Sequence, residues 1–131
     1  MQRHLEELAT KHEILLDTRW IKRTADAYAT RETDGNADEV HTPPIRSDIT
    51  YVTALHEFGH ILGSYQDSRR SLVRECWAWL WARENALVWT HRMEREAVKA
   101  LKLCGAKDSL LRRVIPSPLA PVGCPPRRRG E

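Results

Sequence analysis

Residues 54–68 read ALHEFGHILGSYQDS, in which His56 and His60 stand four positions apart and Glu57 directly follows the first histidine. With 6 His and 11 Glu among 131 residues, chance would produce this H-E-x-x-H pattern only roughly 0.02 times. On an α-helix, His60 lies about 40° around the axis from His56, and Glu57 about 100°. Two imidazoles can therefore share one metal ion while the carboxylate stays beside them. This arrangement predicts Zn²⁺ as cofactor, with His56 and His60 as ligands and Glu57 as general base.

The helix that carries the motif should begin near Ile49, because Ser47 or Asp48 can cap its start, and it should end at Gly63. Gly59 and Gly63 border the ligand face and permit another backbone to approach closely. The core face is expected nearly opposite the ligands and consists of Tyr51, Leu55, Phe58 and Leu62.

A catalytic zinc site needs at least one more protein ligand. A long second helix is predicted from near Ser71 toward Gly105, with a break expected around Thr90 and His91. Glu75 would lie there in an otherwise apolar stripe, and burying an unpaired carboxylate is costly. Glu75 is therefore a candidate metal ligand, unless it pairs with a base such as Arg70 or Arg74. The stripe consists of Leu72, Ala78, Trp79, Ala82, Ala86 and Trp89.

The loop after the motif offers another source for the third ligand. Up to Gly63 the sequence resembles the metzincin pattern H-E-x-x-H-x-x-G-x-x-H, but the third ligand position holds Gln66, with Asp67 one residue later. Amides are poor zinc ligands, and Met93 stands in a helical context rather than in a Met turn. The sequence alone leaves Glu75, Gln66 and Asp67 as alternatives.

The chain also resembles the ImmA/IrrE family of small zinc metallopeptidases of bacteria, phages and mobile elements, over roughly residues 20–104. The resemblance rests on HEFGH and on RECWAWLWA, which is similar to that family's E-x-x-A-x-x-F-A pattern at Glu75, Ala78, Trp81 and Ala82. It implies a gluzincin-like site with His56, His60 and Glu75 as ligands and Glu57 as catalytic acid and base. It further implies a protein substrate, a repressor-type transcription factor.

The remaining pattern predicts an α+β fold, in which a small antiparallel sheet packs on a helical core. Residues 3–16 have apolar side chains at helical spacing, and short β-compatible runs between residues 20 and 45 surround a turn at Asp34-Gly35-Asn36. The two prolines in VHTPPI place residues 40–45 at a sheet edge or just past a strand end. At an edge they could bind an extended peptide substrate; otherwise they form an inert connector.

Length and composition predict one domain over residues 1–115, including a short helix at 107–114, and a disordered Pro/Arg-rich tail at 116–131. The motif and the resemblance imply that this domain is zincin-like. The net charge is +3, but the last seven residues carry three arginines and one glutamate, so a nucleic-acid partner is not favoured. Three widely spaced cysteines suggest reduced thiols. The absence of a long apolar run argues against a signal peptide or membrane span, so a cytoplasmic location is expected.

A non-catalytic domain is the main alternative to a peptidase. In that case zinc would staple two helices, and Trp77 and Trp81 would bind a partner. Glu57 favours catalysis, because a structural zinc site normally closes its fourth position with another ligand. Candidates for stabilising an oxyanion are Tyr51, Tyr65 and His91.

Overall fold

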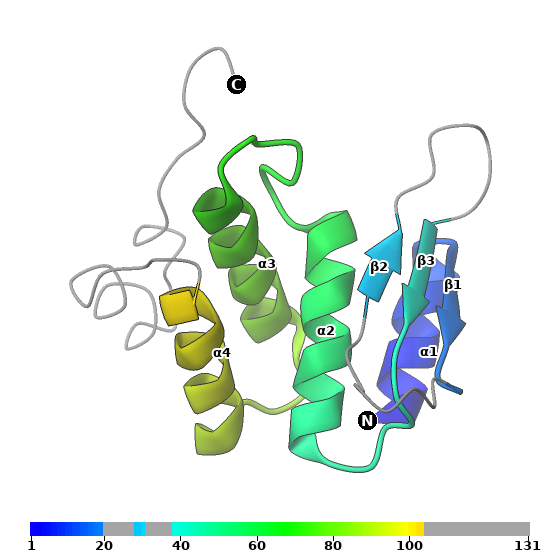
Figure 1. Ribbon diagram of the computed structural model, residues 1–131. Helices are drawn as coiled ribbons and strands as arrows, with labels where there is room; N and C mark the ends of the chain where they lie inside the picture. The colour runs from blue at the N-terminus through cyan, green and yellow to red at the C-terminus, as the bar shows by residue number, and fades with distance from the viewer. Residues whose placement is uncertain (20–27, 31–37, 104–131) are drawn as a thin grey trace.

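A computed structural model describes residues 1–19, 28–30 and 38–103 of the protein. These residues form four helices and a small sheet (Figure 1), so the predicted mixture of helices and strands is confirmed. In chain order, the elements are α1 (Gln2–Lys11), β1 (Ile14–Asp17), β2 (Tyr28–Thr30), β3 (Asp38–His41), α2 (Asp48–Leu62), α3 (Ser71–Asn85) and α4 (His91–Leu103).

The sheet is mixed, with the strand order β1-β3-β2. Strand β1 pairs with β3 in parallel, with Ile14 opposite Asp38, whereas β2 pairs with β3 antiparallel. The prediction of an antiparallel sheet is therefore wrong for the β1–β3 pair. Parallel neighbours need a connection of a dozen or more residues, and the chain between Asp17 and Asp38 is long enough to supply one.

Strand β3 lies in the centre of the described sheet, so the expectation that residues 40–45 form an edge is wrong for Val40 and His41. Pro43 and Pro44 follow the end of the strand, which was the other position predicted for them. Proline cannot donate a ladder hydrogen bond, so next to a strand that is paired on both sides it is tolerated only beyond the end of the strand.

The helix predicted over residues 3–16 is shorter than expected. Helix α1 ends at Lys11, Glu13 has a positive φ of 54°, and the next residues form β1. Ile14 is buried and Leu15 exposed, which is the alternation of a strand. Such a short apolar run fits a helix or a strand equally well, so periodicity could not separate the two.

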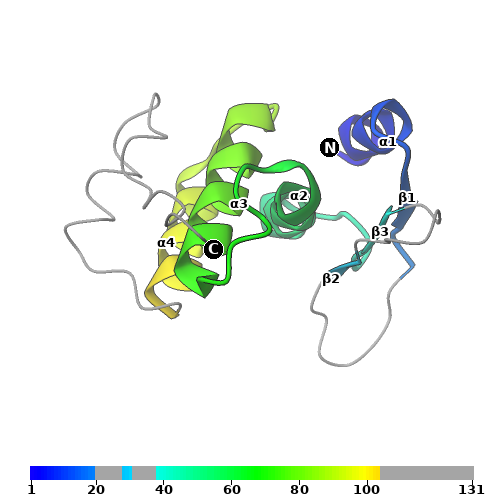
Figure 2. The same cartoon turned by 90° about the horizontal axis from the view of Figure 1, so that it is seen from above.

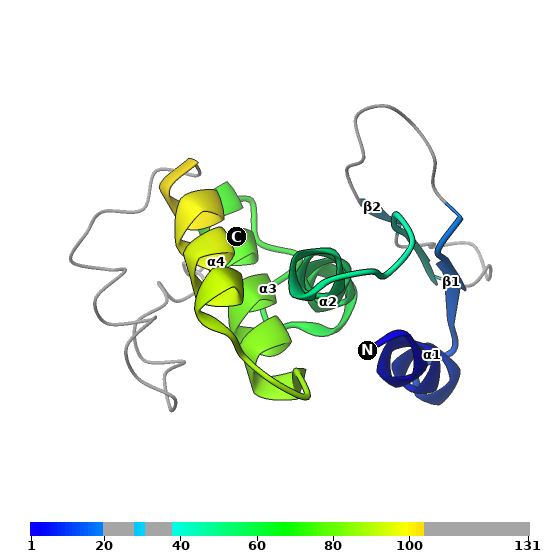
Figure 3. The same ribbon diagram turned by 90° about the horizontal axis from the view of Figure 1, so that it is seen from below.

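Helix α2 occupies the middle of the molecule. Figures 2 and 3 show α3 and α4 on one side of it, and α1 with the sheet on the other. Its predicted core residues Tyr51, Leu55 and Phe58 are fully buried, while Leu62 is half-buried at the margin of the core. Ser47 caps the helix as predicted and forms a capping box with Thr50.

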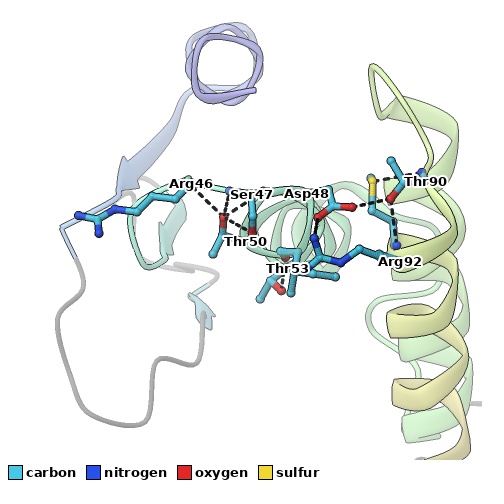
Figure 4. A network of polar contacts seen from close by, with 9 residues as sticks. Arg46, Ser47, Asp48, Thr50, Thr53, Thr90 and Arg92 are labelled. Carbon is cyan, nitrogen blue, oxygen red and sulfur yellow. Dashed lines mark hydrogen bonds and ion pairs between the residues drawn. The ribbon is translucent and has the colours of Figure 1, made fainter.

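The long second helix expected after the motif is two helices, α3 and α4, separated after Asn85. Thr90 caps the start of α4, where its hydroxyl accepts a hydrogen bond from Met93 N at 3.2 Å. The same hydroxyl donates to Asp48 Oδ2 at 2.7 Å, and Arg92 forms an ion pair with Asp48 at 2.9 Å (Figure 4). These contacts join the first turns of α2 and α4, and the predicted break lies where α4 begins.

Two features bear on the predicted location of the protein. Cys76 of α3 is fully buried and disulfide-bonded, so the expectation of reduced thiols is wrong at this residue; Cys104 and Cys124 lie outside the described residues. Because disulfides are rare in the cytosol, the cysteines no longer support a cytoplasmic location, which stays a prediction. None of the described helices has the length and apolar character needed to cross a bilayer.

Some predictions fall where the structure describes no residues. These are the β-compatible run at 20–23, the turn at 34–36, the short helix at 107–114 and the tail at 116–131.

Candidate metal centre

Three side chains from two neighbouring helices converge at the candidate site. His56 and His60 project from α2 and Glu75 from α3, and one ligand atom from each lies within 4.8 Å of the others. The Glu75 carboxylate bridges the two rings, with Oε2 at 2.7 Å from His56 Nε2 and Oε1 at 3.1 Å from His60 Nε2. The structure thus brings together the two histidines of the motif and Glu75, one of the three candidates for the third ligand.

Gly59 explains how α3 can approach α2 closely enough to place Glu75 there. A Cβ atom at this position would collide with the carbonyl oxygen of Ala78 and lie 2.9 Å from its Cα atom. Ala78 follows Glu75 by three residues, about one helical turn, so the close approach and the ligand lie on the same face of α3. A glycine inside a helix costs about 1 kcal/mol relative to alanine, and here it removes the side chain that would separate the two helices.

His56 is held by the aromatic side chain of Trp79, also on α3. The two rings stack at a centroid distance of 4.1 Å with 10° between their planes, and the His56 side chain is only 13% exposed. Burial lowers the pKa of His56 and outweighs the opposing effect of its hydrogen bond to Glu75. A neutral imidazole is the form that binds a metal, so this packing both orients the ligand and favours its reactive state.

The charge of Glu75 is balanced by the two histidines. Burial raises the pKa of Glu75, but the hydrogen bonds with His56 and His60 outweigh it and hold the pKa well below its usual range. For His60 burial likewise lowers the pKa, and the hydrogen bond and negative charge of Glu75 reverse this effect and raise it. Among the described residues Glu75 forms ion pairs with the two histidines and none with Arg70 or Arg74, the alternative that the sequence left open.

Glu57 lies beside the cluster but outside it. Its Oε1 atom is 3.7 Å from His56 Nδ1, too far for a hydrogen bond, and its side chain is 13% exposed. Burial, with a smaller contribution from the Glu75 charge, raises the pKa of Glu57 to about 7. A carboxyl group with this pKa can both accept and release a proton near neutral pH.

The other candidates for the third ligand take different positions. Gln66 contacts Nδ1 of His60, on the opposite side of the ring from Glu75, at 2.9 Å. Asp67 is exposed and does not belong to the cluster. Sequence reasoning missed this contact and the stacking of Trp79 on His56, although both residues stood in segments that it had singled out.

The chain was compared with known proteins. No family model, curated protein or solved structure matches it. The function of the site is therefore inferred from its own geometry and chemistry.

The donor set fits zinc. Two imidazole nitrogens and one carboxylate form the protein ligands of catalytic zinc sites of the His₂Glu type, which leave one position open for water or substrate. No fourth His, Cys, Asp or Glu among the described residues joins the group. The described residues thus supply three ligands.

The three candidates for an oxyanion stabiliser have other contacts. The Tyr51 hydroxyl is buried between His4 Nδ1, at 2.6 Å, and the backbone N–H of Leu87, at 3.0 Å. The Tyr65 ring meets the edge of Trp77, and His91 lies close to Glu94 at the exposed start of α4. None of these contacts points to a catalytic role.

Proposed function

We propose that this chain is a zinc-dependent metallopeptidase that hydrolyses a peptide bond in a protein substrate. The observation that carries the proposal is the convergence of His56, His60 and Glu75 within 4.8 Å, with Glu57 beside the cluster and not part of it. A purely structural site has no need of such a carboxylate, whereas hydrolysis requires a group that moves protons.

His56 and His60 would hold Zn²⁺ through Nε2, and Glu75 through its carboxylate. When bound, the ion supplies a Lewis acid that acidifies a coordinated water and polarises the scissile carbonyl. Trp79 keeps the His56 ring in place by stacking on it and shields it from solvent. Gly59 keeps α3, and with it Glu75, at the distance from α2 that the cluster needs.

Glu57 performs the proton transfers in this proposal. Its carboxylate accepts a proton from the attacking water and returns it to the leaving amine, so one group acts first as base and then as acid. General acid–base catalysis of this kind contributes about 10²- to 10⁴-fold to the rate.

The resemblance to the ImmA/IrrE family suggests a repressor-type transcription factor as the substrate. Because β3 is central, β2 replaces residues 40–45 as the strand to which an extended substrate would bind; it is an edge of the described sheet and lies beside α2 (Figure 1). Binding to a strand edge relies on backbone hydrogen bonds and therefore accepts many sequences.

The non-catalytic alternative has less support. Trp77 and Trp81 are partly buried and pack against the core, where Trp81 stacks on Phe58 and Trp77 meets Tyr65. They do not form the exposed aromatic surface that this alternative predicted for partner binding.

The test combines zinc stoichiometry with peptidase activity on a mixed peptide library, read by mass spectrometry. Wild-type protein should bind one zinc ion and cleave peptides. Glu57→Gln should keep the zinc and lose about 10²- to 10⁴-fold in turnover, whereas Glu75→Ala should lose affinity for zinc. Glu84→Ala is the matched control, because Glu84 is an exposed glutamate on the same helix.

Each result separates the two functions. Zinc binding without any cleavage by the wild type would favour the non-catalytic domain. Full retention of zinc by Glu75→Ala would contradict the assigned ligand set, and a wild type that binds no zinc would refute the proposal.

A further inference from the structure

Gln66, in the loop between α2 and α3, uses its whole side-chain amide in hydrogen bonds. Its Oε1 atom lies 2.9 Å from His60 Nδ1, and its Nε2 donates to the carbonyl oxygens of Ser64, at 3.1 Å, and Arg74, at 2.9 Å. The side chain is partly buried. Gln66 therefore connects this loop to the candidate metal centre.

The two carbonyl groups determine which way the amide points. Turned by 180°, the amide would place its oxygen against the oxygens of Ser64 and Arg74 and leave three acceptors facing one another. With Nε2 engaged by both carbonyls, Oε1 must face the histidine. A carbonyl oxygen can only accept a hydrogen bond, so Nδ1 of His60 must carry the hydrogen.

From this contact we infer that Gln66 is a positioning residue that keeps a hydrogen on Nδ1 of His60, so that Nε2, which contacts Glu75 in the metal-free protein, is the nitrogen left to bind a metal ion. The inference rests on the zinc site proposed above. Metal-binding histidines are commonly oriented in this way by a partner on their other ring nitrogen, and loss of such a partner costs about 10- to 100-fold in metal affinity.

Gln66 also reaches the second helix of the site. Arg74, whose carbonyl accepts one of its hydrogen bonds, directly precedes the ligand Glu75. One side chain thus connects a ligand ring on α2 with the backbone beside the ligand on α3. Its loss should disturb the distance between the two ligands as well as the ring.

Two substitutions separate positioning of His60 from simple support of the loop. Gln66→Met keeps the approximate size and removes every hydrogen bond. Gln66→Glu keeps an acceptor for the Nδ1–H of His60 but loses the donors to Ser64 and Arg74. If Gln66 only supported the loop, both variants would weaken zinc binding equally; if it positions His60, the glutamate variant rescues the affinity.

The measurements are zinc affinity, by competition with a chelator, and long-range proton–nitrogen NMR of the zinc-bound protein with labelled histidine. Gln66→Met should weaken zinc binding about 10- to 100-fold, and Gln66→Glu should bind zinc more tightly than Gln66→Met. In the wild type, the spectrum should show hydrogen on Nδ1 of His60. Ser64→Ala is the matched loop control and should bind zinc normally, because Ser64 contributes only its backbone carbonyl.

Wild-type affinity in Gln66→Met, equal losses in both variants, or a wild-type His60 without hydrogen on Nδ1 would each overturn the role of Gln66 and leave the zinc site intact. A wild type that binds no zinc would instead refute the proposed function, and this inference with it. If Gln66→Met does not fold, Gln66→Glu and the wild-type spectrum still test the inference. The inference is overturned if Gln66→Glu binds zinc as weakly as a variant in which His60 has been replaced.

Discussion

Histidines meet carboxylates in two regions of this molecule, and the two groups are built differently. Between α2 and α3, two imidazoles share the single carboxylate of Glu75. On the sheet, the single ring of His41 lies between two carboxylates, 3.2 Å from Asp17 of β1 and 3.2 Å from Glu39 of its own strand. Only the first group supplies three mutually close ligand atoms among the described residues.

The difference shows that a histidine beside an acid is not in itself a metal site. His41 connects β3 to the neighbouring strand β1, and a ring with an acceptor at each nitrogen is suited to that structural role. At the α2–α3 site, both Nε2 atoms point to one place, and the fold brings a third donor to it from another helix. The number of converging imidazoles therefore distinguishes a group that could hold a metal ion from one that joins two strands.

Replacing one histidine from each group should produce the largest contrast. His60→Asn removes a proposed ligand. Its zinc affinity should therefore fall by more than the about 10- to 100-fold that follows the loss of a residue hydrogen-bonded to a ligand. Zinc at 100 times its Kd stabilises a protein by about 2.7 kcal/mol, and this gain should vanish in His60→Asn. His41→Asn should keep the stabilisation by zinc, and its free energy of unfolding should fall by about 1 kcal/mol because the side-chain contacts of His41 on the sheet are lost. Thermal melting with and without zinc measures both.

The comparison would fail if His41→Asn lost its response to zinc. In that case the sheet group, and not the α2–α3 cluster, would contain the principal metal ligand.

Gly59→Ala tests the close approach of the helices on which the cluster depends. The added methyl group would press on the Ala78 backbone and should cost about 1–3 kcal/mol of stability, as overpacked cores do. Zinc affinity should fall as well, because Glu75 moves with α3. Chemical denaturation of the metal-free protein and a zinc titration measure the two effects.

Thr53→Ala provides the control for that experiment, since Thr53 is partly buried on the same helix and its hydroxyl bonds only to the backbone of its own helix. Unchanged zinc affinity in Gly59→Ala would mean that the cluster does not need this helix spacing.

The smallest effect is expected at a histidine that belongs to neither group. Burial lowers the pKa of His4 from its ordinary value of 6.5, against an opposing contribution from Glu7. The unfolded chain therefore binds more protons than the folded one as the pH falls through 6.5, so the contribution of His4 to stability is present above that pH and lost below it.

Metal-free wild type and His4→Gln should be unfolded with denaturant at several pH values. The wild type should lose more stability than the variant between pH 7 and pH 5, because other titrating groups contribute equally to both. Parallel curves would contradict the role given to His4.

Local patterns were sufficient for the element that carries the motif. Ser47, the apolar face and Gly63 predicted α2 within one residue at each end, because capping and helical periodicity act over a few residues. They were insufficient for β1, whose four residues carry too little periodicity to distinguish a strand from a helical turn. The break between α3 and α4 was anticipated, but the contacts of Asp48 with Thr90 and Arg92 were not.

By itself, the sequence determined that His56 and His60 share one face of a helix with Glu57 beside them, since this follows from a 3.6-residue repeat. The tertiary structure decided that Glu75 joins them, because its position depends on how closely two helices pack. It also decided that β1 and β3 run parallel. Distances within a helix are dictated by the local backbone, whereas distances between elements depend on the packing of the whole core.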